Sequence, residues 1–177
     1  MNFIIDGNLS HLANYDNLLK TVSDVYIQYA TLFGTDTMSK IKLYIDNVAN
    51  FEKANSGYTP MIIPIFNEYL FVKLGIPDFG DTAKIIYQFS HELAHYVFYS
   101  LMGFDKPFAD YEEEVICTAF SLSMIKKKCK QDVFENYCNY VNSVEEEQYR
   151  DGYSLGIDYE FNLHNLKIRL KTKAMEY

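Results

Sequence analysis

Residues 81–103 read DTAKIIYQFSHELAHYVFYSLMG and carry the periodicity of one long helix. Asp81 is a suitable N-cap and Gly103 a suitable terminator. Between them apolar residues recur every three or four positions, at Ile85, Ile86, Phe89, Leu93, Val97 and Leu101. We therefore expect a helix that directs Phe89 and Leu93 toward the protein core.

The middle of this predicted helix holds an HExxH motif, His91 to His95. Residues four apart lie about 40° apart around a helix, so both imidazoles could reach one tetrahedral zinc ion. Glu92 lies about 100° from His91, which suits a general base that acts on a metal-activated water without binding the metal. A catalytic zinc usually has three protein ligands, so one more is expected.

The third ligand is expected from a second helix that begins near Asp110. Glu113 can pair with Asp110 in a capping box. Glu114 lies at helical spacing from small side chains that permit a close approach, namely Cys117, Thr118 and Ser121. We expect Glu114 to be the ligand and keep Glu113 as the alternative. The metzincin class, in which a further His supplies the third ligand, is excluded, because Phe98 and Leu101 stand where a metzincin would have Gly and His.

Eighteen residues separate His95 from Glu114, and a small residue, Cys117, follows three positions later. This arrangement resembles the gluzincin metallopeptidases. The resemblance implies a zincin-like fold, one Zn²⁺ per chain held by His91, His95 and Glu114, and hydrolysis of peptide bonds with Glu92 as base. Residues 114–121 are also similar to a helix of the cytoplasmic repressor-cleaving metallopeptidases of mobile elements. They depart from it at Cys117 and Ser121, where alanine is usual, so that substrate class is not carried over.

The rest of the chain predicts an α+β fold in a single zincin-like domain, residues 1–177. An N-terminal helix is expected over about 10–33, with Ser10 as its N-cap. The catalytic core, about 40–130, should pack a small antiparallel or mixed sheet against the HExxH helix and the Glu-bearing helix. C-terminal helices are expected within 131–175, one in 131–150 and one in 160–175.

The expected strands are residues 40–48 and a segment within Met61–Leu74. A turn at Asn55–Gly57 would make them antiparallel neighbours. Pro64 has no N–H to donate and should place its strand at an edge or a bulge. In gluzincins an edge strand above the motif helix binds extended substrate, and Met61–Leu74 could supply it here.

The composition narrows the class of protein. A net charge of -8, from 16 Lys+Arg and 24 Asp+Glu, argues against binding to nucleic acid or to an anionic membrane. Residues 61–66 are too short to span a bilayer, and residues 1–11 lack a signal-peptide pattern. Three cysteines without a CxxC pair suit a reducing compartment, so we expect a cytoplasmic protein whose partner is a peptide or protein substrate.

A donor for the reaction's oxyanion is harder to select, since the chain has 16 Tyr. Tyr153, Tyr159 and His164 are the candidates, because gluzincins often take such a donor from a downstream element. No exopeptidase signature is present, which favours an endopeptidase. Two alternatives stay open: a zinc-binding regulatory protein without catalysis, and a toxin or effector protease specific for one protein.

Overall fold

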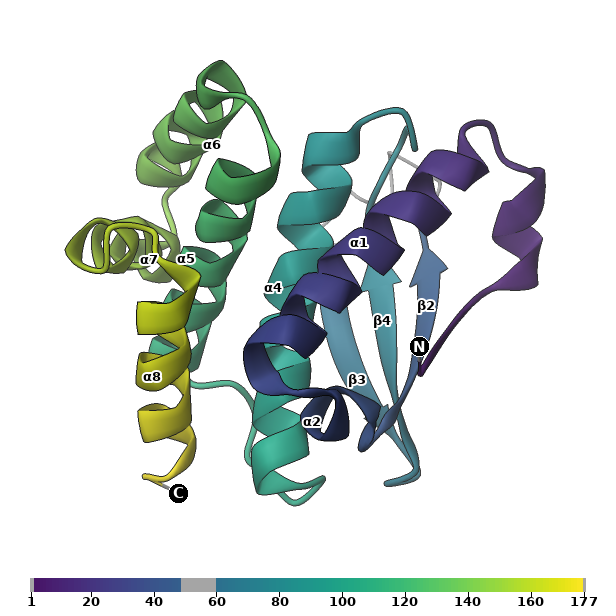
Figure 1. Cartoon of the computed structure of the whole chain (residues 1–177), viewed down its shortest axis with the longest axis horizontal. Helices are drawn as coiled ribbons and strands as arrows, with labels where there is room; N and C mark the ends of the chain where they lie inside the picture. The colour runs from purple at the N-terminus through teal and green to yellow at the C-terminus, as the bar shows by residue number, and fades with distance from the viewer. Residues whose placement is uncertain (1, 49–59, 177) are drawn as a thin grey trace.

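The described residues form a four-stranded mixed sheet with helices packed on one of its faces (Figure 1). The structure, a computed structural model, describes residues 2–48 and 60–176. The strand order is β1-β2-β4-β3, and only β3 runs antiparallel to its neighbour. The strands are β1 (Phe3–Ile5), β2 (Lys42–Asn47), β3 (Met61–Ile65) and β4 (Tyr69–Leu74). This confirms the predicted α+β class with a small mixed sheet.

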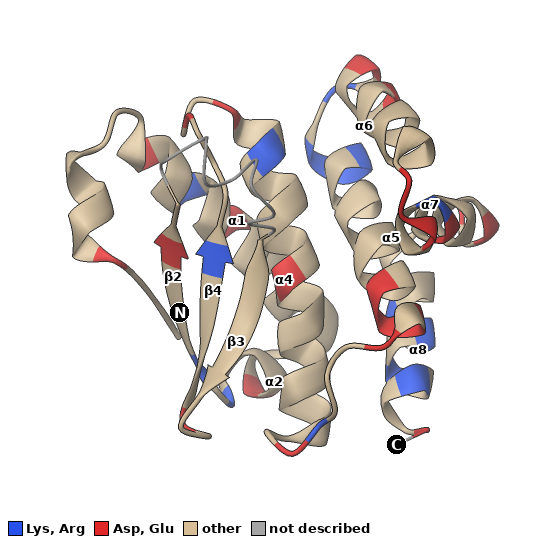
Figure 2. Cartoon of the chain, turned by 180° about the vertical axis from the view of Figure 1, so that it is seen from behind, with Lys and Arg blue, Asp and Glu red and all other residues tan. Residues whose placement is uncertain are grey.

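Helices α1 (Tyr15–Phe33) and α4 (Thr82–Met102) cover one face of the sheet, and Figure 2 shows the strands in front of them from the other side. Alternate residues of β2 and β4, such as Leu43 and Leu70, are buried in the core beneath these helices. Helix α5 (Tyr111–Lys128) packs beside α4. Around α5 lie three further helices, α6 (Gln131–Ser143), α7 (Glu147–Asp158) and α8 (Leu163–Ala174).

Both helices of the predicted site form where the sequence places them. The Asp81 side chain accepts a hydrogen bond from the Lys84 N–H at 2.9 Å, and α4 ends at Gly103 with a φ of 88°. The Asp110 side chain accepts from the Glu113 N–H at 2.8 Å and so caps α5. Phe89 and Leu93 are fully buried, as predicted. Local capping and periodicity therefore determine the two elements that carry the site.

The N-terminal helix begins later than predicted. A short 3₁₀ helix, η1 (Gly7–His11), comes first, and α1 starts after Asn14, whose φ is 59°. The Ser10 hydroxyl donates to the Gly7 carbonyl, so Ser10 is not the N-cap of α1. The short helix α2 (Thr35–Ser39) follows α1 after Gly34, which has the positive φ of 97° that glycine tolerates. The strand β1 was not predicted.

The predicted strand segment Met61–Leu74 is a hairpin, β3 and β4, that turns at Phe66 and Asn67 with φ values of 52° and 56°. The expected antiparallel pairing of residues 40–48 with this segment is wrong, because β2 pairs with β4 in parallel. The proposed turn at Asn55–Gly57 lies outside the described residues. Pro64 lies on β3 at the sheet edge, which confirms its predicted position.

The C-terminal region holds three helices, where two were predicted. The helix expected over 131–150 is divided, since the backbone is extended at Val144 and Glu146 and α7 starts anew at Glu147. Its third helix, α8, falls within the predicted 160–175. None of the described helices is both long and apolar enough to cross a lipid bilayer.

Candidate metal centre

Helices α4 and α5 bring the three predicted ligands together. His91 Nε2 lies 3.1 Å from Glu114 Oε2 and 3.2 Å from His95 Nε2. His95 Nε2 lies 3.4 Å from Glu114 Oε1. One ligand atom from each of the three residues lies within 4.8 Å of the others, so the cluster could hold a metal ion. The structure thus places together the residues that the spacing and the resemblance selected.

The separations of these atoms fit zinc. Zinc–nitrogen and zinc–oxygen distances of about 2.0–2.1 Å at tetrahedral angles place neighbouring ligand atoms about 3.3–3.4 Å apart. The observed separations of 3.1, 3.2 and 3.4 Å lie close to that value. Two imidazole nitrogens and one carboxylate also form a ligand set of catalytic zinc sites. The donor types and their spacing therefore both suit one ion.

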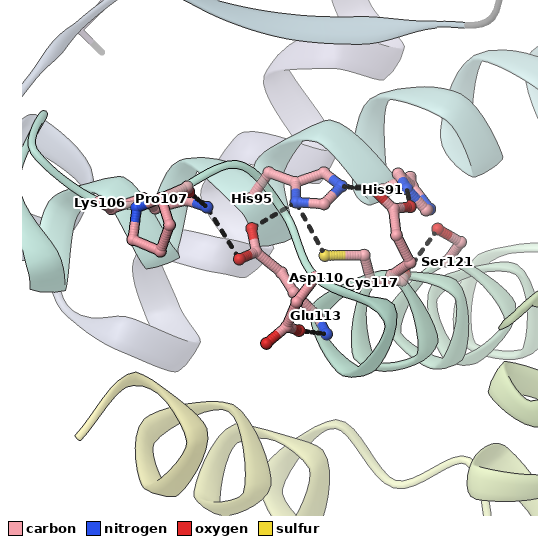
Figure 3. A network of polar contacts seen from close by, with 9 residues as sticks. His91, His95, Lys106, Pro107, Asp110, Glu113, Cys117 and Ser121 are labelled. Carbon is pink, nitrogen blue, oxygen red and sulfur yellow. Dashed lines mark hydrogen bonds and ion pairs between the residues drawn. The ribbon is translucent and has the colours of Figure 1, made fainter. Parts of the chain in front are cut away.

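Glu113, the alternative ligand, contacts Nδ1 of the His95 ring, whereas Glu114 faces Nε2 (Figure 3). Its Oε1 is 2.7 Å from His95 Nδ1, and its Oε2 is 2.8 Å from the Lys106 ammonium nitrogen. All three side chains are almost completely buried. A carboxylate on the far nitrogen fixes the ring orientation of a metal-binding histidine and leaves Nε2 for the metal. Glu113 is thus placed to orient the His95 ring, while Glu114 faces the Nε2 atoms of the cluster.

The charges at the centre favour a cation. Burial raises the pKa of Glu114, but its hydrogen bonds with His91 and His95 outweigh this effect and hold the pKa well below its usual value. Burial lowers the pKa of His95, whereas Cys117, Glu113 and Glu114 raise it, and the net pKa lies well above the ordinary one. The two glutamates that contact the ring therefore favour positive charge on His95.

Glu92 lies beside the cluster, with only 2% of its surface exposed. Burial raises the pKa of its carboxyl group, and the nearby His91 and His95 partly oppose that rise. A carboxylate with a raised pKa is a better proton acceptor than one in open water. Its position one residue after His91, and outside the ligand set, agrees with the predicted base.

Cys117 is buried under the histidine pair, with its sulfur 3.4 Å from His95 Nδ1. Burial is the main reason that the pKa of its thiol is raised to about 12. The thiol is therefore neutral at ordinary pH. It contacts the Nδ1 side of His95, whereas the Nε2 side faces Glu114. It fills the small space between α4 and α5, as expected for a small core residue.

Two cavities, of about 580 and 340 Å³, meet at the candidate centre. Both are lined by His91, Glu92, Pro60 and Tyr149. The smaller cavity adds Met61 and Ile62 of β3, while the larger one extends toward α6. A chain that crosses the centre would thus have space on both sides of Glu92.

Tyr149 is the site residue that the sequence interpretation missed. It lies on α7, lines both cavities, and its ring centroid is 6.4 Å from that of His91. The three predicted oxyanion donors are not among the residues that line these cavities. Tyr153 packs on Phe161, Tyr159 caps the end of α7, and His164 is exposed on α8, so their role stays a prediction.

Comparison with known proteins gave no match to any family model, curated protein or solved structure. The interpretation of the site therefore depends on the geometry and chemistry of its own residues.

Proposed function

We propose that this chain is a zinc-dependent peptidase of the gluzincin type that hydrolyses peptide bonds, with His91, His95 and Glu114 as ligands. The observation that carries the proposal is the cluster itself: two imidazole nitrogens and one carboxylate oxygen that lie within 4.8 Å of one another, with the buried Glu92 carboxylate beside them. Glu92 distinguishes catalysis from metal binding alone, because a site that only binds zinc has no need of it.

In the proposed reaction the metal would activate water and the carbonyl, and side chains of the protein would transfer the proton and position the groups. When bound, zinc would acidify a water molecule and polarise the substrate carbonyl as a Lewis acid. Glu92 would accept the proton of the attacking water and pass it to the leaving amine. Glu113 and Lys106 would hold the His95 ring in place while this occurs. Tyr149 is suitably placed to donate a hydrogen bond to the developing oxyanion.

The sheet edge offers a place for the substrate backbone. β3 is the last strand of the sheet and pairs with β4 along one side, while Met61 and Ile62 line the smaller cavity. An extended peptide could add to this edge as a further strand, with alternate side chains directed to the cavities. This would place a backbone carbonyl beside Glu92.

The test combines metal analysis with hydrolysis. Purified protein reconstituted with zinc should contain about one zinc per chain and cleave members of a mixed peptide library. Glu92→Gln should keep the zinc and lose cleavage, because this residue is not a ligand. Absence of a stoichiometric transition metal after reconstitution at neutral pH would refute the zinc site. If neither the wild type nor Glu92→Gln cleaves the peptides of the library or folded proteins, a zinc-binding protein without catalysis would be favoured.

A further inference from the structure

The larger cavity beside the candidate centre is walled by tyrosines. Four of them, from three helices, line it: Tyr87 of α4, Tyr137 and Tyr140 of α6, and Tyr149 of α7. Val141 and Val144 complete an apolar wall. The rings of Tyr87 and Tyr137 lie 5.1 Å apart between centroids at an interplanar angle of 35°. The cavity thus presents ring faces and edges within reach of His91 and Glu92.

Several polar groups of this cavity are already bound within the protein. The Gln88 amide oxygen accepts from the Gly75 N–H at 2.9 Å, and its nitrogen donates to the Gly75 carbonyl at 3.2 Å. The Asp81 carboxylate caps α4. The phenols of Tyr87 and Tyr137 stay neutral, since burial raises the pKa of each well above its ordinary value. Beside its charged residues Asp81, Lys84, Glu92 and Glu146, the cavity therefore offers an incoming group a wall of uncharged aromatic and aliphatic surface.

We propose that this tyrosine-lined cavity is the specificity pocket of the peptidase and takes an aromatic side chain next to the bond that is cut. The inference rests on the proposed function for its link to cleavage, but the binding itself does not depend on catalysis. Two aromatic rings attract one another when they meet edge to face or offset, with centroids about 4.5–7 Å apart. An aromatic side chain that enters this cavity would make such contacts with the tyrosine rings of its wall. At about 580 Å³ the cavity exceeds the volume of one aromatic side chain and admits its flanking backbone.

The sequence itself provides a probe for this pocket. The chain contains no tryptophan, so the fluorescence of a tryptophan-containing peptide reports the ligand alone. Zinc-loaded Glu92→Gln protein is titrated with a short peptide that carries one central Trp, and with matched peptides in which Ala or Arg replaces it. The expected result is a blue shift of the indole emission and binding at least about tenfold tighter than that of the Ala peptide in competition.

Variants of Tyr140 test the wall directly, because this side chain is 61% exposed and its truncation should leave the fold intact. Tyr140→Ala should weaken binding of the Trp peptide about three- to tenfold, while Tyr140→Phe, which keeps the ring, should retain most of it. Tyr44→Ala is the matched control. This tyrosine packs against the tilted ring of Tyr69 in the sheet, outside the cavity, and its removal should leave affinity unchanged.

The outcomes separate the pocket from the catalysis. The pocket would be overturned, even if the wild type cuts peptides, by any of three results. These are equal affinity for the Trp and Ala peptides, tighter binding of the Arg peptide, or an affinity for the Trp peptide that Tyr140→Ala leaves unchanged. Selective binding of the Trp peptide without any cleavage by the wild type would support the pocket and overturn the proposed hydrolysis. Cleavage mapped by mass spectrometry beside aromatic residues, and lost selectively in Tyr140→Ala, would support both.

Discussion

Two consecutive glutamates of α5 face different nitrogens of the histidine pair. Glu114 meets Nε2 of both rings, while Glu113 binds Nδ1 of His95 and the Lys106 ammonium. Consecutive helical residues point about 100° apart, so one turn of α5 can supply both a metal ligand and its supporting carboxylate. The buried pair of Glu113 and Lys106 also links the loop between α4 and α5 to the site.

We predict that Glu114→Ala and Glu113→Ala fail in different ways. Glu114→Ala should weaken zinc binding by more than about 100-fold, because a ligand is lost, and should destabilise the metal-free protein less than Glu113→Ala does, because Glu114 is 28% exposed whereas Glu113 is buried. Glu113→Ala should weaken zinc binding by about 10–100-fold and also lower the free energy of unfolding by about 3–5 kcal/mol, since Lys106 is left buried without its carboxylate. Chelator competition and urea denaturation measure the two effects.

The double variant Lys106→Met/Glu113→Leu serves as the control for this pair. It removes both charges together, so much of the stability should return while the orientation of His95 stays impaired. Greater loss of zinc affinity in Glu113→Ala than in Glu114→Ala would show that the ligand assignment is wrong by one residue.

Tyr149 is expected to affect turnover more than the other candidates for the oxyanion donor. Tyr149→Phe should lower kcat by about 100-fold with zinc content unchanged, because one hydrogen bond to the oxyanion is lost while the ring stays in place. Tyr153→Phe, Tyr159→Phe and His164→Ala are measured in parallel. A larger fall in kcat in any of these three would move the donor role to that residue.

At the scale of the elements, α7 reaches the site because it crosses α5 closely. Gly152 faces Thr118 at this crossing, and a Cβ atom at position 152 would lie 2.5 Å from Thr118 Cβ and 3.0 Å from the Val115 carbonyl oxygen. The glycine therefore sets the distance between the two helices and with it the position of Tyr149, one turn earlier on α7. The C-terminal helix α8 also holds α5 in place. Lys173 of α8 pairs with Asp110 and Glu112 at the start of α5, next to Glu113 and Glu114.

We predict that Gly152→Ala destabilises the protein by about 1–2 kcal/mol. Alanine favours a helix by up to about 1 kcal/mol over glycine, but the clash with Thr118 should exceed this gain. Because α7 must move, turnover should also fall while zinc binding, which uses α4 and α5, is kept. Ser154→Ala on the same helix is exposed and is the control. Unchanged or increased stability of Gly152→Ala in thermal denaturation would contradict this account of the crossing.

The elements that could be predicted are those with local signals. α4 and α5 have an acidic N-cap and apolar periodicity within their own residues, and the HExxH spacing places two candidate ligands on one face. The parallel pairing of β2 with β4 has no such signal, because it joins segments that are distant in the chain. The hairpin turn at Phe66 and Asn67 lacks the glycine that usually marks such a turn, so the sequence predicts a single strand segment within Met61–Leu74.

The candidate site likewise contains residues that local sequence signals predict and residues that depend on the tertiary fold. His91, Glu92 and His95 follow from one helix, and Glu114 required only that the next helix pack against it. Tyr149 could not be selected among 16 Tyr, because its position depends on the crossing of α5 and α7 at Gly152. The link from Lys106 through Glu113 to His95 was equally hidden, since a lysine in a polar loop gives no sign that it will be buried.

At the scale of the whole molecule, part of the net charge of -8 lies around the candidate centre. Figure 2 shows acidic segments on α4, at the start of α5 and near the start of α7. Among the described residues, the side chains that line the two cavities include the acidic Asp81, Glu92, Glu113, Glu114 and Glu146 and the basic Lys84 and Lys106. A divalent ion at the centre would still leave this lining slightly negative.

We therefore predict that peptides with basic flanking residues are cut faster than acidic ones that share the same aromatic centre. At an ionic strength of about 10 mM the difference in kcat/KM should reach about fivefold or more, because the Debye length is then about 30 Å and the whole acidic entrance attracts the peptide. At about 0.5 M salt the Debye length falls to a few ångströms, and the two peptides should differ by less than about twofold. The effect should lie in KM, since the flanking charges do not touch the reacting atoms. Faster cleavage of acidic peptides at low salt, or a preference for basic peptides that persists at high salt, would show that specific contacts decide the approach and not the charge of the molecule.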